Sequence, residues 1–214
     1  MSQQERVLPL FPLERVVLFP GMSLPLRIFE ERYKVMIGAC QVTDQVFGVL
    51  LIRSGSEVGA PAIPERVGCT ARMLRVDRLP DGRINILTIG ERRFRLLGPA
   101  RAVAEGYLVG DARLLTDHAT PPVPTDLVKN VTAEFAKYEQ ARLAGRQQTP
   151  LRPELARDPM RLSYQVAASL HIHPRESQQL LELDQVAGRL QHELELLKRE
   201  NRPAPKTIGP FSMN

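Results

Sequence analysis

Metal binding is the first chemistry that residue spacing suggests, because His171 and His173 are separated by a single residue. Two ligands do not complete a tetrahedral site, which takes further donors from His, Cys, Asp or Glu. The two cysteines, Cys40 and Cys69, lie far away in the N-terminal half. Pro174 follows directly and marks a helix boundary, which is an ordinary structural place for a histidine. We therefore expect no metal site.

Catalytic patterns are missing from the sequence as well. The nearest approach to a nucleophilic serine is Ser23 in the Gly-Met-Ser-Leu-Pro run at residues 21–25, where Pro25 replaces the second glycine of a nucleophile elbow. No Gly-x-x-x-x-Gly-Lys-Ser/Thr loop for a triphosphate occurs. Asp158 and Asp184 could form an acid pair, but each stands where a helix needs an N-cap. The sequence predicts a protein without enzymatic activity and without a cofactor.

The composition is typical of a soluble globular protein. The chain has 214 residues, of which 43% are hydrophobic and 25% charged. Cys40 and Cys69 stand in apolar surroundings, so we expect buried free thiols and no disulfide. The N-terminus has no basic segment followed by an apolar one, and no apolar run reaches the roughly 20 residues of a membrane span. We therefore expect a cytoplasmic protein that does not bind a membrane.

The net charge of +5 raises the question of a nucleic-acid partner. Most of the excess lies between Arg66 and Arg101, a segment that holds nine arginines. Several of them alternate with apolar residues, as the solvated face of a strand does. Phe94 is the only aromatic residue among them that could stack on a base. An RNA-binding module is therefore the alternative function, and a protein partner is favoured.

The first half of the chain has the pattern of a small β structure. Residues 16–19 and 46–52 are short apolar runs rich in β-branched side chains, as in strands buried on both faces. Residues 69–76 and 84–89 alternate on either side of a Pro-Asp-Gly turn, which predicts a hairpin. The alternation is interrupted between Met73 and Leu74, which indicates a bulge. Beyond the bulge, Leu74 should face inward. Many short strands favour a closed or half-closed barrel.

One helix is expected within this half, at residues 29–40. Apolar residues recur there at helical spacing, and Phe29 and Tyr33 should both enter the core because they lie four positions apart. Glu30 stands at the start of this helix, where the helix dipole favours a carboxylate. We expect it to pair with Arg27 or with an arginine of residues 92–95.

The second half of the chain is expected to be helical. Three prolines within residues 121–124 exclude a helix or a central strand, so they indicate a linker. Helical spacing follows, and the predicted helices begin at Thr125, Asp158, Pro174 and Asp184, with the first, second and fourth residues as N-caps. The predicted domains are a β-barrel subdomain at 1–118, a helical bundle at 119–200 and a disordered tail at 201–214.

Several short motifs occur in a definite order along the chain. The N-terminal ones are Leu-Pro-Leu-Phe-Pro-Leu at 8–13, Val-Leu-Phe-Pro-Gly at 17–21 and Leu-Pro-Leu-Arg-Ile-Phe-Glu-Glu-Arg-Tyr at 24–33. Later ones are Gly-Cys-Thr-Ala at 68–71, Asp-Gly-Arg at 81–83, Gly-Glu-Arg-Arg-Phe at 90–94, Asp-Pro at 158–159, Leu-Leu-Glu at 180–182 and Arg-Leu at 189–190. Together they resemble the N-terminal, substrate-recognition domain of Lon proteases over about residues 7–200.

This resemblance implies an α+β fold: an N-terminal PUA-like β pseudo-barrel with one helix, followed by a C-terminal α-helical bundle. It also implies a non-catalytic module that binds unfolded or tagged protein segments, or a partner protein. A complete Lon protease carries an ATPase and a serine–lysine peptidase after this domain, and the motifs of neither occur in the 214 residues.

A surface that captures unfolded segments needs apolar side chains that a partner can reach. Tyr107 and Tyr138 flank the proline-rich linker, one in each half, and Tyr164 lies on a later helix. Aromatic rings with a polar tip suit a half-wet groove between domains. We therefore predict a binding site in the inter-domain cleft, lined by these three tyrosines. The alternative is that they only hold the two halves together.

Overall fold

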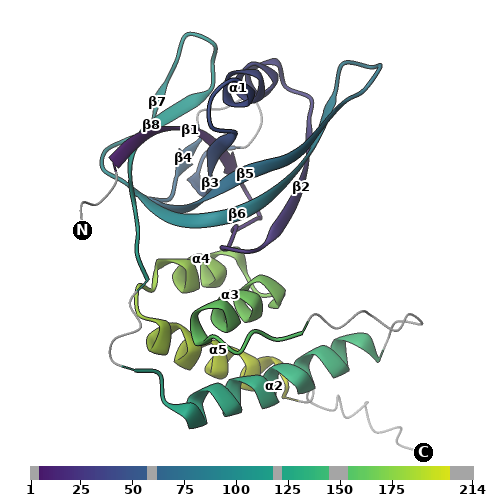
Figure 1. Cartoon of the computed structure of the whole chain (residues 1–214), viewed down its shortest axis with the longest axis vertical. Coiled ribbons are helices and arrows are strands. Elements are labelled where there is room, and N and C mark those ends of the chain that lie inside the picture. The colour runs from purple at the N-terminus through teal and green to yellow at the C-terminus, as the bar shows by residue number, and fades with distance from the viewer. Residues whose placement is uncertain (1–4, 57–61, 118–121, 145–153, 203–214) are drawn as a thin grey trace, which may run out of the picture.

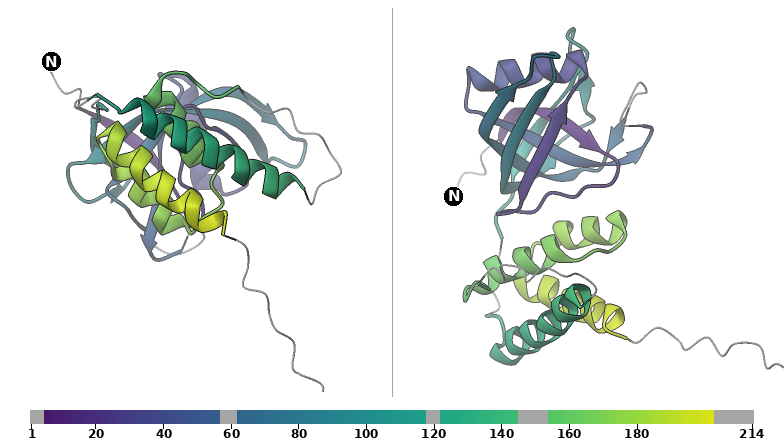
Figure 2. Two further views of the ribbon diagram at one scale, coloured as in Figure 1. Left: turned by 90° about the horizontal axis from the view of Figure 1, so that it is seen from below. Right: turned by 90° about the vertical axis from the view of Figure 1, so that its right-hand side faces the viewer.

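The computed structural model describes residues 5–56, 62–117, 122–144 and 154–202. It has an α+β fold, as predicted, in which a sheet part and a helical part lie one above the other (Figure 1). One helix, α1 (Glu31–Gln41), covers the end of the sheet part that faces away from the other helices (Figure 2). Residues 118–121 of the predicted linker and 203–214 of the predicted tail lie outside the described residues.

The sheet consists of eight described strands. Their bounds are β1 (Glu5–Leu13), β2 (Ser23–Ile28), β3 (Val46–Ser54), β4 (Ile63–Pro64), β5 (Val67–Arg78), β6 (Ile84–Leu96), β7 (Arg101–Ala102) and β8 (Leu108–Leu114). The hydrogen-bonded order is β2-β6-β5-β3-β1-β8-β7, β4 pairs with β3, and β6 also pairs with β8. Because β6 bonds to both β5 and β8, the sheet closes on itself. Its β1–β3 pair is parallel and the other pairs are antiparallel, so the sheet is mixed.

The two apolar runs that predicted buried strands have different outcomes. Residues 46–51 of β3 are all buried, as predicted. The prediction of a strand at residues 16–19 is wrong, because this segment pairs with no strand. Val17, Leu18 and Phe19 are nevertheless buried. Apolar content therefore located a buried segment, while the backbone hydrogen bonds that define a strand depend on neighbours far away in the sequence.

The segment after Phe19 is held against β6 at Gly90. The backbone N–H of Gly21 donates to Gly90 O at 2.8 Å, and Gly90 N–H donates to Met22 O at 2.9 Å. A Cβ atom on residue 90 would lie 2.2 Å from Phe19 O. This close approach of two backbones requires glycine and fixes the position of residues 19–22.

The predicted hairpin between β5 and β6 is confirmed. Gly82 turns the chain with a φ of +78°, and Asp81 Oδ1 accepts a hydrogen bond at 3.0 Å from the backbone N–H of Arg83. The register of the two strands shifts around Leu74, which confirms the bulge. Leu74 itself is 56% exposed, so the prediction that it faces inward is wrong. The extra residue of the bulge turns this side chain to the outer face.

Helix α1 begins later than predicted, at Glu31, because Glu30 is an extended N-cap residue. Phe29 precedes the helix and is 56% exposed, whereas Tyr33 is buried as predicted. The prediction that Phe29 enters the core is wrong, since it follows the in-and-out alternation of the preceding strand rather than the spacing of a helix. Glu30 pairs with Arg32 at 2.9 Å and with neither of the predicted arginine partners.

Four described helices make up the second part: α2 (Thr125–Leu143), α3 (Pro159–Ser169), α4 (Pro174–Glu182) and α5 (Val186–Glu200). Helix α4 lies nearest the sheet, and α2 and α5 lie side by side at the far end (Figures 1 and 2). Their apolar stripes are buried as the helical spacing predicts, including Val131, Phe135, Leu162, Val166, Leu190, Leu194 and Leu197.

One of the three predicted helix caps is confirmed. The carboxylate of Asp158 accepts a 2.9 Å hydrogen bond from a backbone N–H of the first turn of α3. Thr125 lies inside α2, whose N-cap position is Pro124. Asp184 lies before the N-cap of α5 and instead stands 3.1 Å from Arg93. A cation of the sheet outcompetes the helix terminus for this carboxylate.

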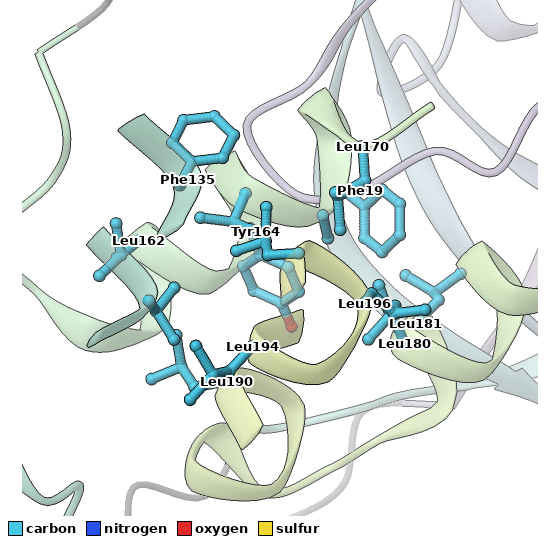
Figure 3. Packing of buried hydrophobic residues seen from close by; sticks show 14 of the residues in the cluster. Phe19, Phe135, Leu162, Tyr164, Leu170, Leu180, Leu181, Leu190, Leu194 and Leu196 are labelled. Atoms are coloured by element: carbon cyan, nitrogen blue, oxygen red, sulfur yellow. The ribbon is translucent and has the colours of Figure 1, made fainter. Parts of the chain in front are cut away.

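A single apolar cluster spans both parts of the molecule. It joins the inner faces of α2–α5 to Val17, Phe19, Leu51 and Val67 of the sheet part (Figure 3). Two further clusters fill the sheet part, one of them beneath α1. The helices therefore share a continuous core with the sheet.

Both cysteines are free and buried, as predicted. Burial is the main cause that raises the pKa of the Cys40 thiol to about 11. This thiol is consequently protonated and unreactive at neutral pH.

Candidate functional site

A buried ionic cluster joins the sheet to the helices. Arg93, from β6, has a side chain that is 1% exposed. Its Nη1 donates to the backbone carbonyl of Leu181 at 2.8 Å, and its Nη2 lies 2.8 Å from Asp117 Oδ1 and 3.1 Å from Asp184 Oδ1. One guanidinium of the sheet thus contacts α4, the connection before α5 and the segment that leaves β8.

Asp117 is the centre of this ionic cluster. Its carboxylate accepts a 2.6 Å hydrogen bond from the hydroxyl of Tyr164 and a 3.2 Å hydrogen bond from Arg189 Nη1. The buried guanidinium of Arg189 also lies 4.0 Å from the centroid of the Tyr164 ring and donates from Nε to Ser163 Oγ at 2.9 Å. Burial is the main cause that raises the pKa of the Tyr164 hydroxyl, which therefore stays a donor at neutral pH.

A pocket of about 1120 Å³ lies beside the ionic cluster, between the sheet part and the helical part. We call it the junction pocket. Its walls are residues 20–23 at the start of β2, 91–93 of β6, 115–117 after β8, 154–157 before α3, and one face of α3. Its apolar lining includes the half-buried side chains of Met22, Leu115, Leu155 and Met160.

Local sequence explains how the helical wall of the junction pocket is built. Met160, Tyr164 and Ala168 are spaced four residues apart, so they lie along one face of α3. Gln165, next to them, holds the preceding segment in place: its side-chain carbonyl accepts from the backbone N–H of Ala156 at 2.8 Å. The opposite wall is fixed by the close fit of the 19–22 segment on Gly90 described above.

The three tyrosines predicted to line the binding site do not lie together. Tyr164 lines the junction pocket, but it is 5% exposed and its hydroxyl is engaged by Asp117. Tyr138 is buried in the helical core, where its hydroxyl accepts from the backbone N–H of His171 at 2.9 Å. Tyr107 is half-buried against the cluster beneath α1. Tyr164 is thus the member of the trio that the fold puts at the junction.

The residues that suggested other chemistry have structural contacts. His173 Nδ1 accepts a 3.2 Å hydrogen bond from the backbone N–H of Arg175 and caps α4. Ser23 opens β2 and pairs there with Ile89. Within the described ranges, no three His, Cys, Asp or Glu residues are grouped so that they could hold a metal ion. In the same part of the chain, no helix is long and apolar enough to cross a membrane.

Sequence reasoning missed the ionic cluster. Arg93 was considered only as part of the basic 66–101 segment and as a possible partner of Glu30, and Asp117 belongs to the proline-rich segment interpreted as a linker. A signal was available at Arg189, which comes three residues after Val186 on the stripe that α5 buries. A charged residue on an apolar stripe indicates a buried partner.

The same stripe of α5 carries a second buried charge-bearing residue. Glu193 is 0% exposed, and neither of its carboxylate oxygens has a hydrogen-bond partner among the described residues. Burial raises its pKa well above the ordinary value of a glutamate, and the nearby Arg189 lowers it only in part. Burial in the helical core thus favours the neutral form of this carboxyl over the charged form.

These observations describe an α+β protein whose sheet and helices meet at a buried ionic cluster next to an open pocket. The chain matches the family described as the ATP-dependent protease La (LON) substrate-binding domain over residues 7–199, and it belongs to that family. The resemblance drawn from the short motifs is confirmed.

Similar proteins support this assignment. The Lon protease of Roseiflexus castenholzii is 32% identical over 205 residues, which cover 91% of this chain and 24% of the relative. Lon protease 1 of Hydrogenovibrio crunogenus is 29% identical over 201 residues, with 89% and 24% covered. The chain therefore spans about a quarter of the length of these relatives.

Solved structures show the same fold. The crystal structure of a Lon N-terminal domain protein from Xanthomonas campestris has a TM-score of 0.68 at 26% identity and covers 89% of this chain and 98% of that one. The N-terminal domain of the Mycobacterium avium complex Lon protease has a TM-score of 0.62 at 20% identity, with 90% and 98% covered.

Proposed function

We propose that this chain is a non-catalytic module that binds unfolded or tagged protein segments, and that it binds them in the junction pocket. The observation that carries the proposal is the pocket itself, which opens between the two parts of a fold whose family is described by substrate binding. We further propose that the closed sheet is a PUA-like pseudo-barrel, that α2–α5 form a bundle, and that the protein acts in the cytoplasm.

The size and lining of the junction pocket support a polypeptide ligand. Its volume of about 1120 Å³ exceeds the range of roughly 300–1,000 Å³ that is usual for small-molecule sites. Unfolded segments differ from folded proteins in exposing apolar side chains, and Leu155 and Met160 offer apolar surface against which such side chains can pack. Each Å² of apolar surface that the bound segment buries contributes about 25 cal/mol to the free energy of binding.

The test is to shorten one apolar wall residue and measure the binding of labelled casein, an unfolded protein. The Met160→Ser variant should bind casein about fivefold more weakly, because it loses apolar contact worth about 1 kcal/mol. Val42→Ser is the matched control, since Val42 is 84% exposed and lies at the end of α1, outside the pocket lining.

The results of this experiment test the binding function and the location of the binding site separately. If folded Met160→Ser binds casein as tightly as the unchanged protein, the site lies elsewhere. If the unchanged protein binds no casein over a wide concentration range, the proposed function itself is rejected.

A further inference from the structure

Three arginines around the junction pocket have no carboxylate partner among the described residues. Arg92 of β6, Arg157 before α3 and Arg161 in the first turn of α3 are all exposed and line the pocket. Within the described part of the chain, none of their side chains forms an ion pair or a hydrogen bond. Some other exposed arginines do pair: Arg101, for example, donates to Asp111 at 2.9 Å.

The acidic residues that line the same pocket are mostly engaged. Glu91 pairs with Arg72 on the outer face of the sheet. Asp117 is shared by the two buried arginines of the ionic cluster. Glu154 is the remaining acid of the lining and is exposed. Three cations thus stand against one carboxylate, so the pocket attracts negative charge.

We propose that the junction pocket takes an extended acidic protein segment, with apolar side chains packed on Leu155 and Met160 and carboxylates bound by Arg92, Arg157 and Arg161. This inference rests on the proposed function and names the class of segment that the pocket selects. A guanidinium presents paired N–H donors that match the two oxygens of a carboxylate.

Nucleic acid fits this pocket less well than an acidic peptide, although both are anionic. Recognition of single-stranded RNA relies on bases stacked on aromatic faces. The aromatic residue of the lining, Tyr164, is buried, and its ring lies against the guanidinium of Arg189. The apolar walls of Leu155 and Met160 have no counterpart in a phosphate backbone.

The experiment compares three short labelled peptides that share the same leucine positions and carry Glu, Gln or Lys between them. Fluorescence anisotropy should give the tightest binding for the Glu peptide and the weakest for the Lys peptide. The preference for Glu should shrink as salt rises, because the Debye length falls from about 10 Å at 0.1 M to about 3 Å at 1 M.

The decisive variant combines Arg92→Gln, Arg157→Gln and Arg161→Gln. Each lost pair should weaken binding of the Glu peptide about two- to fivefold and leave binding of the Gln peptide unchanged. The matched control combines Arg27→Gln, Arg53→Gln and Arg175→Gln, which removes the same charge from exposed positions outside the pocket lining. Thermal melts check that both variants are folded.

Several results would overturn the inference. Equal binding of the three peptides, with casein still bound and Met160→Ser still weakened, rejects the acidic preference and leaves the proposed function standing. An equal loss in the control triple variant shows that only net charge matters. Binding of oligouridylate more tightly than the Glu peptide, lost in the pocket triple variant, assigns the arginines to RNA. Failure to bind either casein or any peptide rejects both proposals.

Discussion

Removing the charge of Asp117 should destabilise the whole protein. The side chain of Asp117 is 13% exposed, and it lies between Arg93 and Arg189, which are 1% and 0% exposed. The Asp117→Asn variant keeps the shape of the side chain and leaves two buried guanidinium groups without their shared carboxylate. Removing one partner of a buried ion pair costs about 3–5 kcal/mol.

The expected effect is large enough for a thermal melt. For a protein of this size, 1 kcal/mol corresponds to about 2–4 °C, so Asp117→Asn should lower the melting temperature by roughly 6–20 °C. Asp184→Asn is the matched control, because Asp184 also contacts Arg93, at 3.1 Å, but is 47% exposed. An exposed pair is worth about 0–1 kcal/mol. Equal shifts in the two variants would refute the reasoning that burial makes Asp117 the essential anion.

Two further predictions concern stability. Because burial raises the pKa of Glu193, the folded state holds this proton more tightly than the unfolded state, and stability falls as pH rises above about 4.5. The Glu193→Met variant should lose this pH dependence, and its free energy of unfolding at pH 8 should be about 1–3 kcal/mol higher. Urea unfolding at pH 5 and pH 8 measures both effects. An unchanged free energy of unfolding at pH 8 would show that the carboxyl has a partner. Gly90→Ala should lower the free energy of unfolding by about 1–3 kcal/mol, since the added Cβ would meet Phe19 O. Gly98→Ala is the control and should change it little, because nothing lies within 4 Å of a Cβ at that position. Equal effects of the two variants in urea unfolding would contradict the close approach at Gly90.

Local rules predicted the elements whose determinants lie within a few residues of each other. The turn at Gly82 and the cap at Asp158 depend on backbone and side-chain contacts within one turn, so sequence alone identified them correctly. The buried stripes of α2–α5 also follow directly from helical spacing. The type of most elements is therefore encoded locally.

The failures have a common physical cause, which is competition from distant residues. Asp184 satisfies the local rule for an N-cap, but Arg93 lies close enough to bind it. Phe29 fits the helical spacing, but the preceding strand extends almost to it and sets its direction. A site at the junction was predicted, but of its predicted residues only Tyr164 lines the pocket, because the walls come from five segments that only the folded chain brings together.

The apolar cluster that spans both parts of the molecule couples the stability of the whole fold to ligand binding in the junction pocket. Phe19 and Val67 pack with the helices, so neither part can unfold without exposing the other, and a single melting transition is expected for the chain. A ligand that binds the folded junction pocket then stabilises every element at once, by about 2.7 kcal/mol at a concentration 100 times its Kd. Mixtures of unlabelled peptides can therefore be screened by melting temperature alone, with the entire fold serving as the sensor.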